Sequence, residues 1–181
     1  MIGVLRGMGI TLKNFLLSYV TPRKPDSLDT PGIVTIQYPA EKLVEKERFR
    51  NFPFLVYDEA AENPRCVACD ICAKECPPKC IYIVRDTDAE GRALKKPKIF
   101  DIDHTVCMNC GICEEACPFD AIFMDHEFEI AGPERQGNLL YHKEKLLKSN
   151  DHFRKIRPTD AEAIDGRRRA AEEKKKANAI S

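Results

Sequence analysis

Two cysteine runs share one spacing, and they constrain the fold more than any other feature of the chain. Each run reads C-x2-C-x2-C-x3-C-P, and every cysteine of the first has a counterpart 41 residues later in the second. The eight cysteines are Cys66, Cys69, Cys72, Cys76, Cys107, Cys110, Cys113 and Cys117. An internal repeat of this kind predicts two equivalent halves that fold as one unit.

This spacing is the one by which bacterial ferredoxins bind tetranuclear iron–sulfur clusters. Three cysteines, with two residues between each and the next, let a short loop surround one cluster. In two-cluster proteins the fourth cysteine ligates the other cluster. We therefore predict crosswise ligation of two 4Fe–4S clusters. The predicted ligands are Cys66, Cys69, Cys72 and Cys117 for cluster one, and Cys76, Cys107, Cys110 and Cys113 for cluster two.

Two other uses of cysteine fit the pattern less well. Structural zinc sites usually take two CxxC pairs for one tetrahedral ion, whereas each run here is a triplet with a trailing Cys-Pro. Disulfides need an oxidising compartment and do not call for such close triplets. Thiolate-bound clusters indicate a reducing compartment, either the cytoplasm or the interior of an organelle.

The repeat also predicts the fold class. An apolar strand enters each cysteine loop, and a short helix followed by a second strand leaves it. The predicted strands are residues 54–57 and 81–84 in the first half and 98–102 and 121–124 in the second. Two such units predict an α+β, bacterial-type two-cluster ferredoxin-like domain over residues 54–125. The polar residues 86–97, which contain Gly91, predict a surface loop or hairpin between the halves.

Residues 1–22 predict an amphipathic helix that docks on a membrane. Apolar side chains recur at three- and four-residue spacing, while Arg6 and Lys13 make the segment basic. It is too short and too charged to span a bilayer, and no small-residue cleavage site marks it as a secretory signal. A basic amphipathic helix suits the membrane interface or a membrane subunit. The alternative is packing on its own domain, and its three glycines, at 3, 7 and 9, lower its helix propensity.

The remaining segments predict two arms on the cluster domain. Residues 23–53 predict an extended connector that wraps partners, with a short extended stretch at 33–38 and a solvated helical turn within 41–50. Residues 126–181 predict a C-terminal extension whose tail is disordered or lies on a partner.

Charge is unevenly distributed along the chain. The net charge is zero, yet residues 1–25 hold four Lys or Arg and no acid, and residues 142–181 hold 12 Lys or Arg against 7 Asp or Glu. An acidic body with basic ends favours a protein placed against something at its ends. We expect no nucleic-acid partner, because Glu172 and Glu173 interrupt the basic run and no aromatic residue accompanies it.

The two halves differ at a few informative positions. Asp70 stands where the second half has Gly111. Either aspartate is present because it tolerates a left-handed backbone, or its negative charge lowers the reduction potential of cluster one. Cys80, the ninth cysteine, stands where the second half has Ala121, and we predict that it is a small buried residue and not a ligand. His104 is either an ordinary loop histidine or a group that tunes a cluster. Apolar residues that we expect to shield the clusters are Val67, Ile71, Met108 and Ile112.

The flanks carry a resemblance beyond the cluster motif. The basic amphipathic start, VTIQYP at 34–39 with Glu41-Lys42, ERFR at 47–50 and EFEIA at 127–131 resemble the subunit of respiratory complex I that carries two 4Fe–4S clusters. The resemblance covers roughly residues 5–147. Asp70 and Cys80 depart from the commonest pattern of that family.

The resemblance implies an electron-relay subunit of a membrane-associated, proton-translocating NADH:quinone oxidoreductase. Electrons would pass through the two clusters toward the cluster in a neighbouring subunit that reduces quinone. The implied partners are that cluster subunit, the membrane quinone-channel subunit and the membrane surface. The implied place is the cytoplasmic face of a bacterial inner membrane, or the matrix side in an organelle. No residue has the pattern of a catalytic acid, base or nucleophile. The alternatives are the cluster subunit of a membrane-bound hydrogenase and a free, soluble two-cluster ferredoxin.

Overall fold

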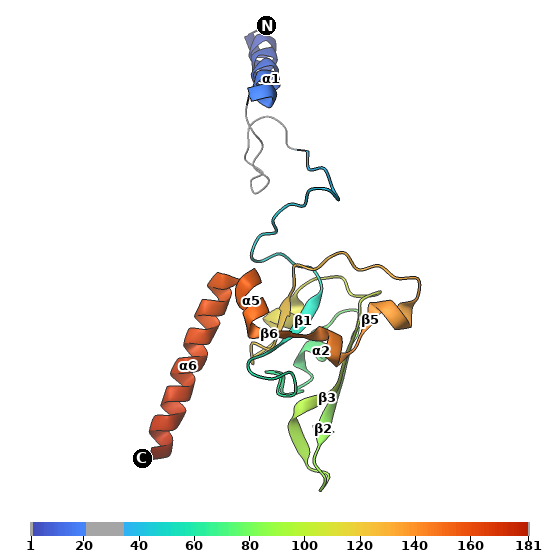
Figure 1. Ribbon diagram of the computed structural model, residues 1–181, viewed down its shortest axis with the longest axis vertical. Helices are drawn as coiled ribbons and strands as arrows, with labels where there is room; N and C mark the ends of the chain where they lie inside the picture. Colours follow the sequence, from blue (N-terminus) through green and yellow to red (C-terminus); the bar gives the residue numbers. More distant parts are fainter. Residues whose placement is uncertain (1, 21–34, 181) are drawn as a thin grey trace. The chain divides into compact units, whose positions relative to one another are not determined.

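The computed structural model describes residues 2–20 and 35–180, and for residues 136 and 172–180 it describes the backbone alone. The chain divides into two compact units, Met1–Lys46 and Glu47–Ser181 (Figure 1). The second unit has two three-stranded sheets and several short helices, which makes it α+β as predicted. The division into four segments made from the sequence stays a prediction.

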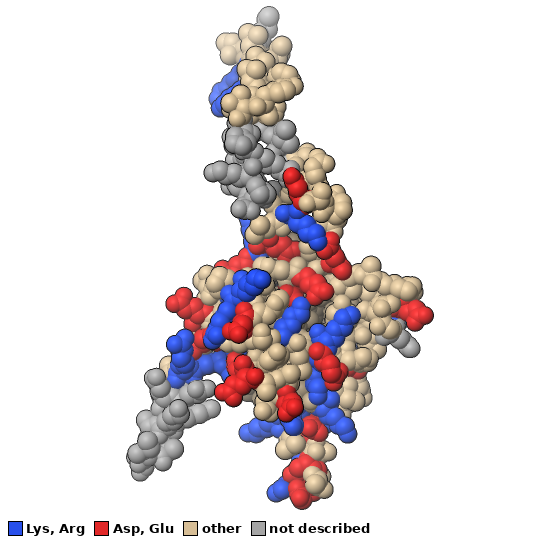
Figure 2. Space-filling model, in the orientation of Figure 1, with Lys and Arg blue, Asp and Glu red and all other residues tan. Residues whose placement is uncertain are grey.

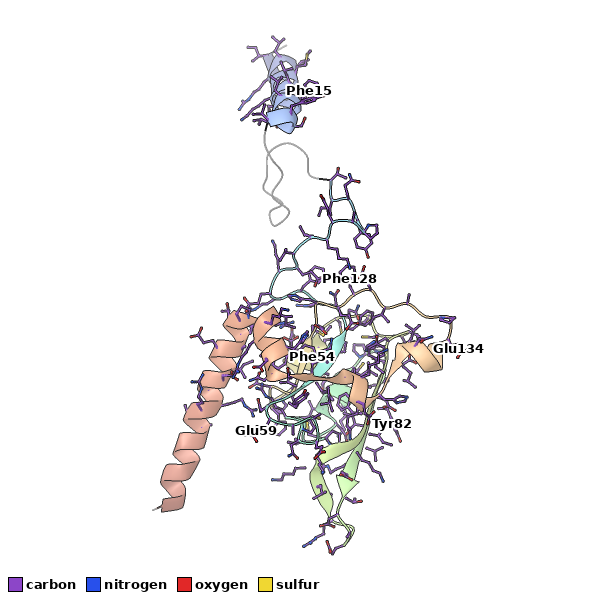
Figure 3. The ribbon with its side chains drawn as sticks, viewed as in Figure 1. Phe15, Phe54, Glu59, Tyr82, Phe128 and Glu134 are labelled. Carbon is purple, nitrogen blue, oxygen red and sulfur yellow. The ribbon has the colours of Figure 1, made fainter. Side chains whose placement is uncertain are left out.

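The first unit contains the predicted N-terminal helix, α1 (Ile2–Val20). Its apolar side chains stand out from the helix, among them Phe15, and Lys or Arg atoms occupy only one edge in the view (Figures 2 and 3). None of the helices in the described parts of the chain is long and apolar enough to cross a membrane. This agrees with the predicted helix type.

The connector after α1 differs from the prediction where the structure describes it. Of the stretch expected to be extended, residues 33–34 lie outside the described residues. Residues 35–37 have no regular structure, and residues 38–40 form a turn with a cis bond between Tyr38 and Pro39. The prediction of a helical turn within 41–50 is wrong. Glu47 and Arg48 lie in a turn, and their side chains bind Thr159 and Asp160.

Strand β1 (Pro53–Tyr57) lies at the centre of the first sheet, in the order β4-β1-β6. It pairs antiparallel with β4 (Ile122–Met124) and parallel with β6 (Leu147–Ser149). Successive side chains of a strand point to opposite faces. Leu55 accordingly joins a core with the cysteines, while Phe54 and Val56 join a second core beneath the C-terminal helices (Figure 3). Burial on both faces explains why the strand is apolar throughout.

The second sheet is built on a long hairpin. Strand β2 (Ile81–Thr87) pairs antiparallel with β3 (Ala93–Asp103), and β5 (Leu140–Tyr141) adds to the far edge of β3. The hairpin projects from the rest of the unit (Figure 1). The segment expected to be a loop or hairpin is therefore a hairpin, and its turn includes Gly91 with a φ of 76°. The four predicted strands are confirmed, with β2 and β3 longer than expected.

The C-terminal extension is an integral part of the second unit. After the π-helix η1 (Arg135–Leu139) and the short α4 (Lys143–Leu146) come α5 (Asn150–Ile156) and α6 (Pro158–Ile180). Phe153 of α5 is fully buried and stacks on Phe123 with ring centroids 4.0 Å apart. Ala161 and Ile164 of α6 complete this second core. Residues 158–180 are thus helical, and the start of α6 packs on β1 and β4.

Residues 47–50 strap the start of α6 to the cluster domain. The Glu47 carboxylate accepts hydrogen bonds from the backbone N–H groups of Thr159 and Asp160, the latter at 3.2 Å. These groups lack partners within the helix, so Glu47 acts as a cap supplied from outside it. Arg48 forms an ion pair with Asp160 at 2.7 Å.

We predict that Phe153→Ala lowers the free energy of unfolding by about 3–5 kcal/mol, the usual cost of removing a fully buried phenylalanine. Anaerobic urea denaturation of the full-length chain, followed by circular dichroism, measures this change. Lys155→Ala, on the exposed side of α5, is the matched control and should change the value by less than about 0.5 kcal/mol. Equal effects of the two variants would mean that α5 is not part of the core.

Candidate iron–sulfur centres

The eight repeat cysteines line two separate cavities. Cys66, Cys69 and Cys72 line one cavity together with Cys117 from the other half of the repeat. A second cavity is lined by Cys107, Cys110 and Cys113 together with Cys76 from the first half. This grouping is the one expected for crosswise ligation.

Each cysteine loop ends in a short helix that stops at or just before the fourth cysteine. Helix α2 (Ile71–Glu75) follows Asp70, and helix α3 (Ile112–Glu115) follows Gly111. A residue before proline avoids the helical region of backbone space. Cys76, which precedes Pro77, accordingly has an extended backbone with φ −67° and ψ 116°. The chain therefore turns away from its own loop at this cysteine.

The backbone of the two loops has the same unusual conformation at equivalent positions. Residues with positive φ come in pairs separated by the repeat distance: Ala68 and Asn109, Asp70 and Gly111, Lys79 and Asp120. Most L-residues pay about 1–2 kcal/mol for a left-handed conformation, whereas asparagine and aspartate tolerate it better. Asp70, with a φ of 63°, fits the conformational reading of this position. Gly111, with a φ of 79°, takes the same place at lower cost.

Each of the two loops has a backbone carbonyl that accepts a hydrogen bond from an arginine, and the arginine differs between the loops. Arg85 on β2 donates two hydrogen bonds to the carbonyl of Ala68, at 2.8 and 3.3 Å, and so restrains the strained residue of loop one. Arg50 donates to the carbonyl of Cys110 at 2.9 Å. A Cβ atom on Gly111 would meet the Arg50 side chain at 3.4 Å, so the arginine packs directly over the turn of loop two. Neither arginine was predicted from the sequence.

Two buried arginines connect the loops to the C-terminal helices. Arg65, directly before Cys66, donates to the Asp58 carboxylate and lies 3.5 Å from Asp165 of α6. Arg157 contacts the Glu114 carboxylate in α3 at 2.5 Å and donates to the Met124 carbonyl. Both guanidinium groups are almost fully buried, so each depends on its carboxylate partners for charge compensation.

Burial disfavours the thiolate form of several cysteines that line the cavities. Burial raises the pKa of the Cys66 thiol to about 11 and the pKa values of Cys72 and Cys113 to about 12. A cluster ligand must be a thiolate, and iron supplies the positive charge that offsets the cost of burying that thiolate. Four sulfurs around each cavity, with mainly apolar residues between them, are a donor set that fits a 4Fe–4S cluster.

The residues expected to shield the clusters lie in the cavity walls. Val67 and Ile71 line the first cavity, and Met108 and Ile112 line the second. Met108 is nevertheless 62% exposed. It therefore covers the second cavity from the solvent side of the loop.

His104 lies in the turn after β3, yet it is buried. Its ring stacks against Phe52 and Tyr141, and in the described part of the chain neither ring nitrogen has a hydrogen-bond partner. Burial lowers the pKa of His104 to about 4, and the nearby Lys145 cation acts in the same direction. A neutral ring packed between aromatic side chains fits a core histidine better than an exposed loop residue.

Cys80 is buried, as predicted for this position. It lines the second cavity together with the four predicted ligands, and its Sγ atom lies 3.4 Å from Sγ of Cys76. Its counterpart Ala121 lines the first cavity in the same way. The sequence identified the site as one for a small residue but did not reveal this contact.

Comparisons with known proteins agree with the geometry. The family model of the 4Fe-4S dicluster domain matches residues 65–121. NADH-quinone oxidoreductase subunit I 2 of Koribacter versatilis is 40% identical over 148 residues, which cover 80% of this chain and 78% of that protein. Subunit I 1 from Nitrosococcus oceani is 48% identical over 113 residues, or 62% of this chain and 61% of that protein. Subunit I from Pseudomonas entomophila is 40% identical over 145 residues, which cover 80% of this chain and 73% of that protein.

Among solved structures, the chain is similar to the membrane-bound sulfane sulfur reductase, an archaeal respiratory membrane complex. The identity is 18%, the TM-score is 0.44, and the match covers 77% of this chain and 74% of that chain. At this score the likeness supports no inference, and the assignment depends on the sequence relatives. The chain belongs to the NADH-quinone oxidoreductase subunit I family, and residues 65–121 form its domain for two 4Fe–4S clusters.

Proposed function

We propose that this chain is an electron-relay subunit of a proton-translocating NADH:quinone oxidoreductase. The observation that carries the proposal is the convergence of four cysteines on each of two cavities in a member of this family. When bound, each 4Fe–4S cluster takes up and releases an electron. The chain's residues have the task of holding the two groups close together and keeping water away from them.

The proposed ligands follow the two cavities. Cys66, Cys69, Cys72 and Cys117 would hold cluster one, and Cys76, Cys107, Cys110 and Cys113 would hold cluster two. Cys76 and Cys117 each belong to one half of the repeat and line the cavity of the other half. The halves therefore cannot separate without each site losing a ligand. This crossing keeps the distance between the clusters short and constant, which a relay requires.

The arginines near the loops have supporting roles in this proposal. Arg85 and Arg50 hold the loop carbonyls and place a positive charge close to each anionic cluster. Charge and hydrogen bonding around a cluster set its reduction potential. In the described part of the chain we assign no residue to acid, base or nucleophilic catalysis. The chemistry at quinone would belong to a neighbouring subunit.

We further propose that α1 attaches the chain to the membrane side of the complex. Apolar residues predominate in this helix, Leu12 and Leu16 among them, and its own unit buries none of them. A water-exposed apolar helix is unfavourable unless a lipid interface or another protein covers it. The partners would be the membrane quinone-channel subunit and the cluster subunit next to quinone, on the cytoplasmic face of the membrane, or on the matrix side in an organelle.

Both alternative functions account for fewer of the observations. A free, soluble ferredoxin has no use for an apolar helix such as α1. The cluster subunit of a membrane-bound hydrogenase would share the relay, but the relatives at 40–48% identity are named as NADH-quinone oxidoreductase subunits.

Crosswise ligation can be tested with single serine variants. We predict that Cys117→Ser perturbs the same electron paramagnetic resonance signal as Cys69→Ser, because both residues line the first cavity. Cys110→Ser should perturb the other signal. Spectra of the reduced full-length variants, prepared anaerobically, give the answer. A Cys117→Ser spectrum that matches Cys110→Ser would show that each cluster uses one run only.

Membrane attachment can be tested on α1. Leu12→Asp combined with Leu16→Asp should lower the membrane-bound fraction at least tenfold, since each buried leucine contributes about 1.5–3 kcal/mol. Fractionation of cell extracts, with the chain quantified in membrane and soluble fractions, measures this change. Asn14→Asp adds a charge without removing an apolar side chain and is the matched control. Unchanged attachment of the double variant would rule out α1 as the docking element.

A further inference from the structure

The second cavity holds a fifth thiol that the first cavity lacks. Cys80 is only 8% exposed, and its Sγ atom lies 3.4 Å from Sγ of Cys76. In the first cavity the equivalent position is Ala121, which has no group able to donate a hydrogen bond. At this position the two halves of the repeat therefore differ by one sulfur atom.

The direction of this hydrogen bond follows from the chemistry of the pair. A cysteine that ligates iron is a thiolate and carries no proton. An ordinary thiol has a pKa of about 8.5 and keeps its proton at neutral pH. A fifth thiolate beside the four ligands would add like charge in a buried place. Cys80 is therefore the donor, through S–H, and the sulfur of Cys76 is the acceptor.

Such a bond has a definite electrostatic effect on a cluster. Hydrogen bonds to the sulfurs are among the factors that set the reduction potential of an iron–sulfur cluster. Reduction adds negative charge, and part of that charge resides on the ligand sulfurs. A donor aimed at one of these sulfurs stabilises the reduced form more than the oxidised form, and a buried environment strengthens the interaction.

We propose that Cys80 raises the reduction potential of cluster two by donating a hydrogen bond to the sulfur of Cys76, and that Ala121 leaves cluster one without this effect. This inference rests on the proposed ligand assignment. Its consequence is an energetic difference between the two clusters that favours the electron on cluster two. The residue does not ligate iron and acts only through its neighbours.

The repeat supplies the matched variants for a test. Cys80→Ala gives the first half the residue found at the matched position of the second half, and Ala121→Cys makes the reverse change. Cys80→Ser keeps a hydrogen-bond donor at the site. Each full-length variant is purified anaerobically with its clusters. Iron is counted, and each cluster is titrated by electron paramagnetic resonance at controlled potentials. Signals are assigned by comparison with Cys69→Ser for cluster one and Cys110→Ser for cluster two.

We expect every variant to keep about eight irons per chain, as two tetranuclear clusters require. In Cys80→Ala, the reduced-to-oxidised ratio of cluster two at a fixed potential should fall about threefold or more, which is a shift of about 28 mV for a one-electron couple. Cys80→Ser should restore part of that shift. Ala121→Cys should raise the potential of cluster one.

Two results would contradict the inference, and only one of them would also contradict the proposed ligand assignment. An unchanged potential of cluster two in Cys80→Ala, with about eight irons present, would overturn the role of Cys80 and leave the relay function standing. Loss of about four irons in Cys80→Ala would show that Cys80 is a ligand, and the proposed ligand assignment would fall with it.

Discussion

Four cysteine sulfurs have to converge on each cavity, and no single loop of this chain supplies more than three of them. The fourth comes from the other half of the repeat, at the point where proline ends a short helix. Metal binding and folding are coupled in such sites, because the ligands come together only in the folded chain. The matched backbone conformations of the two loops serve this requirement.

The second constraint is the burial of β1 on both faces. One face meets the cysteine core, and the other would be exposed without α5 and α6. The C-terminal helices also bring Arg157 and Asp165 to the residues that flank the cysteine loops, Glu114 and Arg65. Breaking a buried ion pair leaves an uncompensated charge, which is costly. The extension therefore stabilises the cluster domain in addition to enlarging it.

Much of the site could be predicted from the sequence, for identifiable reasons. The cysteine spacing, the repeat distance and Pro77 and Pro118 indicated which sulfurs belong together, because ligand spacing is a local property. The strands around the loops could be predicted from short apolar runs.

The roles of Arg50, Arg65, Arg85 and Arg157 could not be predicted, since an arginine that binds a carbonyl or a carboxylate far away in sequence carries no local signal. The helical turn expected within 41–50 failed for the same reason, because Glu47 and Arg48 bind α6. The contact between Cys80 and Cys76 likewise depends on how the loop folds.

We propose that the chain is a two-cluster relay within a membrane-associated complex. The most direct test is to purify the native protein anaerobically from membranes, identify the subunits that accompany it, and count iron and acid-labile sulfide in the same sample. We predict co-purification with flavin-containing and quinone-reactive subunits and about eight irons per chain. A lone soluble protein with the same iron content would contradict it and would indicate a free ferredoxin.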